Sequence, residues 1–244
     1  MDDGEDFIDW KRFNEVVIGG KPINSEMGEK SRFFGFDDDI VSVEKLVIQY
    51  FAMTENGEWN GIHCESSIYR MIFTVFLWNV IFCGDIPFVF QTEYQNAPLD
   101  MGTEWFYVNR KEIIEQRVAE IAKFGDEDIE SVLEEIYEQH GGESVVGIYW
   151  DRFQRDDVVA ICKGIGGMGI GKICLLLSTN YRFWSGGLPD LMLWREVDDG
   201  QFECKIVEVK GPRDHLSEKQ ICWIRYLQKT AALDVAVARV KEQF

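Results

Sequence analysis

The chain has 244 residues, of which 46% are apolar, and this apolar set includes the aromatic residues, which make up 14% of the chain. It can therefore bury the core of one large domain or two small ones, and it is not an intrinsically disordered protein. No basic-then-apolar stretch typical of a signal peptide stands at the beginning, and the longest apolar run, residues 71–83, is too short to cross a bilayer. The six cysteines form no C-x-x-C pair, which argues against a zinc site. We expect a soluble intracellular protein with reduced thiols and no membrane partner.

The net charge of −18 is unfavourable for a polyanionic partner. The acidic excess lies entirely within residues 1–140, however, because residues 141–244 contain as many basic as acidic side chains. The C-terminal part can therefore present a locally basic surface. Charge alone neither supports nor excludes a nucleic-acid substrate.

Two segments are predicted in the N-terminal half. Residues 1–42 combine acidic clusters with glycine, asparagine and serine, which predicts an acidic, loosely ordered lead-in. Residues 43–142 predict a helical part, with one helix over 43–53, a long apolar core helix over 64–83 and one or two amphipathic helices over 110–139. The pair Gly141-Gly142 is the expected boundary with the next segment.

In the third segment, residues 143–244, the pattern changes from helices to strands. Residues 156–182 look helical on either side of a glycine-rich turn. Strands are predicted over 188–195 and 202–210, joined by the hairpin turn Asp198-Asp199-Gly200. A helix over 216–229 begins with the capping box Ser217-x-x-Gln220, and a strand over 234–241 follows. The mixture of helices and strands predicts an α/β protein.

The residues with the strongest chemical signal are Asp190, Glu208 and Lys210. One face of the strand over 202–210 carries apolar or thiol side chains at positions 202, 204 and 206, followed by Glu208 and Lys210. The hairpin brings Asp190 towards the same end of the sheet. Two carboxylates that repel each other are stabilised by a cation, and Mg²⁺ prefers such oxygen ligands and keeps water molecules that can act as nucleophile. The pattern predicts a metal-dependent nuclease site, with a buried structural ion pair as the alternative.

Three other motifs are weighed against this site. The triplet Glu203-Cys204-Lys205 repeats the E-x-K pattern, but Glu203 faces away from Glu208 because five residues separate them. Residues 164–172 match glycine patterns of nucleotide-binding loops, but Ile173 stands where a phosphate-binding loop needs Ser or Thr, which favours a tight turn between helices. We expect Gln220 to cap its helix rather than take part directly.

A family resemblance enters through three C-terminal motifs. They are Gly186-Gly187-Leu188-Pro189-Asp190-Leu191, Lys205-Ile206-Val207-Glu208-Val209-Lys210-Gly211-Pro212, and Leu216-Ser217-x-x-Gln220 followed by Trp223. Together they resemble the VRR-NUC domain, a branch of the PD-(D/E)xK superfamily. Upstream, Gly61-Ile62-His63-x-Glu65, Leu77-Trp78-x-x-Ile81-Phe82, Pro98-Leu99-Asp100 and Trp150-Asp151-Arg152-Phe153 are similar to the Fanconi-associated nuclease family. The resemblance covers roughly residues 43–240.

The resemblance implies a restriction-endonuclease-like (PD-(D/E)xK) core, a small mixed sheet flanked by helices, over residues 143–244, with an extra N-terminal helical part. It implies that Glu65, Asp190, Glu208 and the carbonyl of Val209 bind Mg²⁺ or Mn²⁺, that Lys210 is the catalytic lysine, and that Gln95 lies near the metals. For Gln220, the resemblance leaves a place near the metals as the alternative to capping alone. From the residues alone, Glu65 is expected in the first turn of the core helix, where the helix dipole favours a carboxylate. The alternative is that Glu65 is only a charge at the N-terminus of this helix, without a catalytic role.

The implied activity is cleavage of DNA flaps or branched structures, as a 5′-flap endonuclease and 5′-to-3′ exonuclease, in nuclear repair of interstrand crosslinks. Crosslink-repair proteins are expected to bind through regions of the family outside this chain. The run Gly211-Pro212-Arg213-Asp214-His215 departs from the family, whose members usually continue from Gly-Pro through a polar residue to Asp-Arg. Two other functions are considered: a DNA-binding module with little activity without upstream domains, and a nucleotide-binding protein. The intact Asp190, Glu208 and Lys210 favour a nuclease over the first, and Ile173 disfavours the second.

Overall fold

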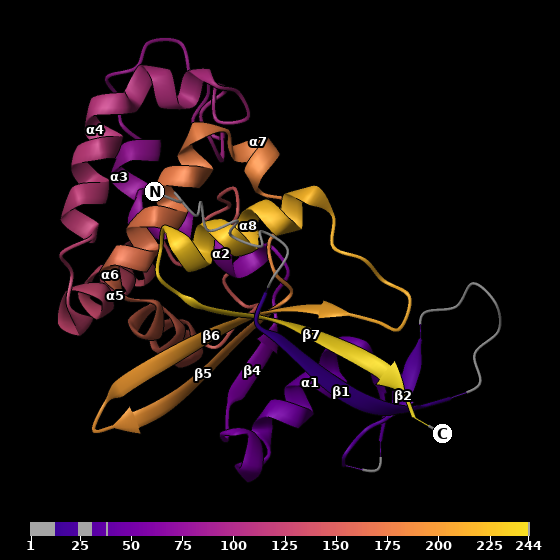
Figure 1. Cartoon of the computed structure of the whole chain (residues 1–244). Helices are drawn as coiled ribbons and strands as arrows, with labels where there is room; N and C mark the ends of the chain where they lie inside the picture. Colours follow the sequence, from indigo (N-terminus) through magenta and orange to yellow (C-terminus); the bar gives the residue numbers. More distant parts are fainter. Residues whose placement is uncertain (1–12, 24–30, 38, 244) are drawn as a thin grey trace, which may run out of the picture.

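The computed structural model describes residues 13–23, 31–37 and 39–243 (Figure 1). The elements follow the chain in this order: β1 (Glu15–Pro22), β2 (Arg32–Phe34), β3 (Ile40–Ser42), α1 (Val43–Ala52), η1 (Thr54–Asn56), β4 (Asn60–His63), α2 (Ser67–Phe76), α3 (Trp78–Ile81), α4 (Trp105–Ile121), α5 (Asp126–His140), α6 (Arg155–Thr179), α7 (Tyr181–Trp184), β5 (Leu191–Asp198), β6 (Gln201–Lys210), α8 (Glu218–Lys229) and β7 (Asp234–Glu242).

The strands form one mixed seven-stranded sheet in the order β3-β2-β1-β7-β6-β5-β4. Its centre is parallel, because β7 pairs in parallel with both β6 and β1. The remaining neighbours, β1 with β2, β2 with β3, β4 with β5 and β5 with β6, are antiparallel. The predicted α/β class is confirmed, with more strands than the sequence pattern indicated.

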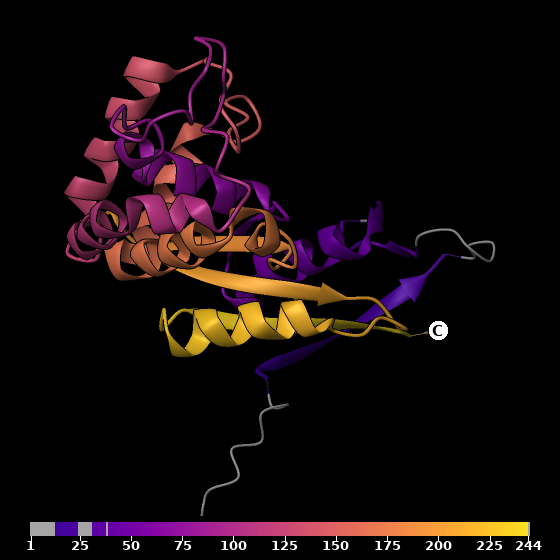
Figure 2. The same cartoon turned by 90° about the horizontal axis from the view of Figure 1, so that it is seen from above.

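Each face of the sheet packs against a different set of helices. On one face, α1 covers the sheet with Leu46, Val47 and Phe51, and Ser42 begins this helix by accepting a hydrogen bond from Lys45 N at 3.3 Å. On the other face lie α2, α6 and α8, and Figure 2 shows α8 lying along β7. Alternate residues of β6 therefore point into opposite clusters, with Cys204 and Ile206 on the α8 side and Val207 and Val209 on the α1 side.

Two expectations for the N-terminal half are corrected. Residues 1–42 are not a loosely ordered lead-in where the structure describes them, because β1, β2 and β3 belong to the sheet. The acidic pair Asp2-Asp3 lies outside the described residues. The long helix expected over 64–83 is two helices, α2 and α3, separated at Leu77. One hydrophobic cluster runs from α2 through α4, α5 and α6 to the strands, across the predicted boundary at residue 142.

The C-terminal elements agree closely with the sequence. The hairpin β5–β6, the capped helix α8 and the strand β7 all lie where the pattern predicts them. The glycine-rich turn is Gly166, whose backbone (φ 71°, ψ 161°) interrupts α6. By length and composition α6 is apolar enough to cross a membrane. Here it is a core helix, broken at Gly166 and packed against α2, α4, α5 and β6.

Candidate active site

The register of the sheet brings Asp190 next to Glu208. Leu191, the first residue of β5, pairs with Val207 of β6, so Asp190 stands one position further along, at the level of Glu208. A hydrogen bond fixes this arrangement, because Val209 N donates to Asp190 Oδ2 at 2.9 Å. The backbone oxygen of Asp190 accepts from Cys64 N at 2.9 Å and from Glu65 N at 3.1 Å. Three segments far apart in sequence therefore meet at the ends of β4, β5 and β6.

Glu208 and Lys210 form the buried centre of the site. The Glu208 side chain is fully buried and that of Lys210 is 9% exposed. Lys210 Nζ donates to Glu208 Oε1 at 2.6 Å, and Gln220 Nε2, from α8, donates to the same oxygen at 2.5 Å. The other oxygen, Glu208 Oε2, is buried and has no hydrogen-bond partner among the described residues. A buried carboxylate oxygen without a hydrogen-bond partner is unusual for a purely structural ion pair.

The two carboxyl groups hold their protons more tightly than exposed ones. Burial, and then the charge of Asp190, raise the pKa of Glu208 to about 7, although Lys210 and Gln220 act in the opposite direction. Burial also raises the pKa of Asp190, against the hydrogen bond from Val209 and the charge of Lys210, and Glu44 of α1 adds to the increase. Glu44 is a neighbour that the sequence pattern did not indicate.

The residues fit a hard divalent cation. The donors are carboxylate oxygens, the type that Mg²⁺ and Mn²⁺ prefer, and Glu208 Oε2 is a buried oxygen to which none of the described residues donates a hydrogen bond. A cation there would offset the repulsion that raises the pKa of Glu208. Among the described residues, no three His, Cys, Asp or Glu side chains are already grouped around one metal position. Asp190 and Glu208 are therefore the pair from which a site is built.

Glu65 lies beside this pair but not as expected. It precedes α2, in the turn after β4, and has a left-handed backbone (φ 46°), which is rare for a residue other than glycine. Its N–H is tied to Asp190, but its side chain is 68% exposed and its Oε1 lies 3.8 Å from His63 Nε2. The expectation of a place in the first helical turn is therefore wrong. The structure brings the Glu65 backbone to the site and leaves the carboxylate at its edge.

Gln95 is not brought into contact with the acidic pair. Its Oε1 accepts from Gln91 N and Thr92 N, and its Nε2 donates to Val89 O and Ala97 O. These contacts all lie within its own loop. The placement of Gln95 near the metals stays a prediction.

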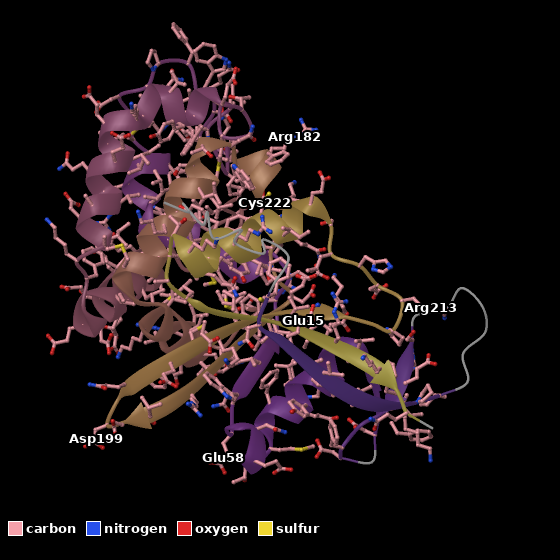
Figure 3. The ribbon with its side chains drawn as sticks, viewed as in Figure 1. Glu15, Glu58, Arg182, Asp199, Arg213 and Cys222 are labelled. Atoms are coloured by element: carbon pink, nitrogen blue, oxygen red, sulfur yellow. The ribbon has the colours of Figure 1, made fainter. Side chains whose placement is uncertain are left out.

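The second E-x-K triplet takes part in two salt bridges. Glu203 pairs with Arg195 at 2.8 Å, and Lys205 pairs with Asp234. Two basic residues, Arg182 on α7 and Arg213 on the β6–α8 loop, are exposed and point outward (Figure 3). The contact of Gln220 with Glu208 is the site feature that the sequence interpretation underestimated.

Two solved structures have a similar fold over nearly the whole chain. Crystal structures of paFAN1 bound to 5′-flap DNA with a gap match with TM-scores of 0.73 and 0.76, at 18% and 19% sequence identity. In both cases the match covers 96% of this chain and 38% of the paFAN1 chain. At this level of identity the likeness concerns the fold.

Sequence comparisons give closer relatives. Homologues of Fanconi-associated nuclease 1 from Oryza sativa and Arabidopsis thaliana are 44% and 41% identical over 93% of the chain, and the Homo sapiens protein is 34% identical over 82%. The chain spans only 23%, 25% and 19% of the length of these three relatives. The model of the VRR-NUC domain matches residues 125–242, which include Asp190, Glu208 and Lys210. The chain thus contains a VRR-NUC domain over residues 125–242 and is similar to Fanconi-associated nucleases along most of its own length.

Proposed function

We propose that this chain is the catalytic part of a metal-dependent, structure-specific DNA nuclease with a PD-(D/E)xK core. The observation that carries the proposal is the convergence of Asp190, Glu208 and Lys210, with Glu208 Oε2 buried and without a hydrogen-bond partner in the described part of the chain. The solved paFAN1 structures, which hold 5′-flap DNA, support a flap as substrate. Cleavage of 5′ flaps, 5′-to-3′ exonuclease activity, crosslink repair and a nuclear location belong to this proposal.

Each residue has a part in the proposed hydrolysis. Asp190, Glu208 and the carbonyl of Val209 hold Mg²⁺ or Mn²⁺, with Glu65 as a further ligand after rotation of its exposed side chain. When bound, such a cation polarises the phosphodiester and makes a water molecule a better nucleophile. Lys210 has three N–H donors, of which one reaches Glu208, so the others can orient the attacking water or stabilise charge on the phosphoryl oxygens. The water oxygen bonds to phosphorus, the ester P–O bond breaks, and the leaving sugar oxygen takes up a proton from solvent in exchange for the proton that the attacking water releases.

The test is cleavage of labelled 5′-flap DNA by the purified chain, with and without Mn²⁺. We expect Asp190→Ala and Lys210→Ala to lower the rate by about 100-fold or more, since each removes charge stabilisation at the reacting phosphate. Lys205→Ala, in the second E-x-K triplet, is the matched control and should cleave like the wild type, because the Lys205 ammonium pairs with Asp234 and lies over the Trp59 ring instead of contacting Glu208. Cleavage that survives loss of Asp190 and Lys210 would overturn the mechanism.

A DNA-binding module with little activity of its own is the second candidate. The observation in its favour is that the chain spans about a quarter of its plant relatives, so further substrate contacts can lie elsewhere in proteins of that length. Binding of flap DNA by the wild type, measured by fluorescence anisotropy, together with no cleavage in Mn²⁺, would favour this candidate over the nuclease.

A further inference from the structure

The N-terminal capping box of α8 has one donor more than capping requires. Ser217 Oγ accepts from Gln220 N at 3.3 Å, and Ser217 N donates to Gln220 Oε1 at 2.9 Å. Glutamate and glutamine both complete such a box, because only an acceptor oxygen is needed at this position. Glutamine also carries an NH₂ group, which capping leaves unused.

This NH₂ group points at the buried carboxylate. Gln220 Nε2 and Lys210 Nζ both donate to Glu208 Oε1, at 2.5 and 2.6 Å. Two donors on one oxygen fix the rotation of the carboxylate and leave Glu208 Oε2 without a hydrogen-bond partner among the described residues. Gln220 on α8 and Lys210 on β6 therefore together determine which oxygen of Glu208 remains available to a cation.

The orientation of the Gln220 amide follows from the box. Its oxygen faces Ser217 N because that N–H needs an acceptor, so its nitrogen must face Glu208. A glutamate at position 220 would complete the box but would place a second carboxylate against Glu208, which is costly where Glu208 is fully buried. Capping alone does not explain glutamine here, whereas contact with Glu208 does.

The rest of α8 holds Gln220 in place against the sheet. Trp223 and Leu227 follow it at helical spacing and are fully buried, and Trp223 Nε1 donates to Trp184 O at 3.1 Å. Gln220 is the polar end of this buried face. Its side chain is therefore held at a fixed distance from β6 by packing as well as by hydrogen bonds.

We propose that Gln220 is a positioning residue, which acts through Glu208 to present Oε2 to the divalent cation. The inference rests on the proposed function, since it assigns Glu208 as a metal ligand. It gives the capping box of α8 a second task, in which the box orients the Gln220 amide and the amide orients the ligand.

The experiment measures Mn²⁺ affinity of the DNA-free chain by calorimetry, together with the melting temperature. Gln220→Ala and the bulkier Gln220→Met should weaken Mn²⁺ binding by about 10-fold, as is common when a partner of a metal ligand is lost. Ser217→Ala is the control: it loses the Oγ cap but keeps the N–H that orients the Gln220 amide. All three variants should melt at a lower temperature, but Ser217→Ala should bind Mn²⁺ within about twofold of the wild type.

The outcomes separate this inference from the proposed function. If the wild type binds Mn²⁺ and the two Gln220 variants bind it equally tightly, the positioning role is wrong and the nuclease proposal stands. If Ser217→Ala loses as much affinity as the Gln220 variants, stability of α8 explains the effect and the positioning role is again wrong. If the wild type binds no Mn²⁺ and Asp190→Ala behaves identically, the proposed metal site itself fails, and this inference fails with it.

Discussion

Glu208 is the residue at which the fold and the proposed chemistry meet. A fully buried carboxylate is stabilised only if its charge is offset and its oxygens are satisfied. Lys210 and Gln220 satisfy one oxygen, and the second has no partner among the described residues. The metal-free protein therefore holds Glu208 in an environment that disfavours its charged form.

The pH dependence of stability should reveal this cost. The pKa of Glu208 is raised from an ordinary value of 4.5 to about 7, so the folded chain binds this proton more tightly than the unfolded chain does. The free energy of unfolding of the metal-free protein should therefore fall as the pH rises from about 4.5 to about 7, by roughly 3 kcal/mol from this group. Urea denaturation in the presence of a chelator measures it.

Glu208→Gln is the matched control for this measurement. It keeps the shape of the side chain and removes its titration. The difference in the free energy of unfolding between wild type and variant should therefore change with pH. A difference that is constant over this pH range would show that the buried charge does not reside on Glu208.

At the scale of elements, the glycines of α6 control how closely helices and strands approach. A Cβ atom at Gly164 would lie 2.7 Å from Cys204 N, in the backbone of β6, so α6 packs directly against that strand. Gly166 has free space around it, and its positive φ is what interrupts the helix. The segment that resembles a nucleotide-binding loop is thus a kink in a core helix, and the element before it is helical rather than a strand.

Gly166→Ala should lower the free energy of unfolding by about 1–3 kcal/mol, because φ 71° with ψ 161° is a region that only glycine adopts readily. Gly84→Ala is the matched control, since a Cβ there also meets nothing within 4 Å but Gly84 has no positive φ. That control should change stability by no more than about 0.5 kcal/mol. Chemical denaturation of both variants decides the point, and equal effects would contradict strain at Gly166.

At the scale of the whole molecule, the sheet joins the two ends of the described chain. Strand β1 pairs with β7, more than two hundred residues later, and β4 pairs with β5 across the intervening helices (Figure 1). The site stands where these long-range pairings meet, because β4 leads to Glu65, β5 follows Asp190 and β6 carries Glu208 and Lys210. The site therefore depends on the pairing of β4 with β5, which joins residues more than a hundred positions apart.

Ile18→Ala should test the structural role of β1. Ile18 is 1% exposed and packs beneath α1, so its truncation should lower the free energy of unfolding by about 2–5 kcal/mol. Val17→Ala, on the neighbouring residue that is 53% exposed, should change it by no more than about 0.5 kcal/mol. If Ile18→Ala were as mild as Val17→Ala in urea denaturation, residues 15–22 would not belong to the core.

The sequence by itself determined the local features of the C-terminal part. The hairpin turn before Gly200, the capping box of Ser217 and the change of period along β6 each depend on residues a few positions apart. The same pattern singled out Asp190, Glu208 and Lys210, because two of them share a strand face and the third follows from the hairpin. Local spacing is sufficient for these features, since their partners are close in the chain.

Only the tertiary structure decided the rest. The described part of the N-terminal segment forms strands, of which β1 pairs with β7, and the local sequence pattern gave no sign of that partner. The turn that holds Glu65 and the contact of Gln220 with Glu208 likewise depend on contacts between different elements. Sequence periodicity describes residues that are neighbours along the chain, whereas these contacts join residues that come together only in the folded sheet.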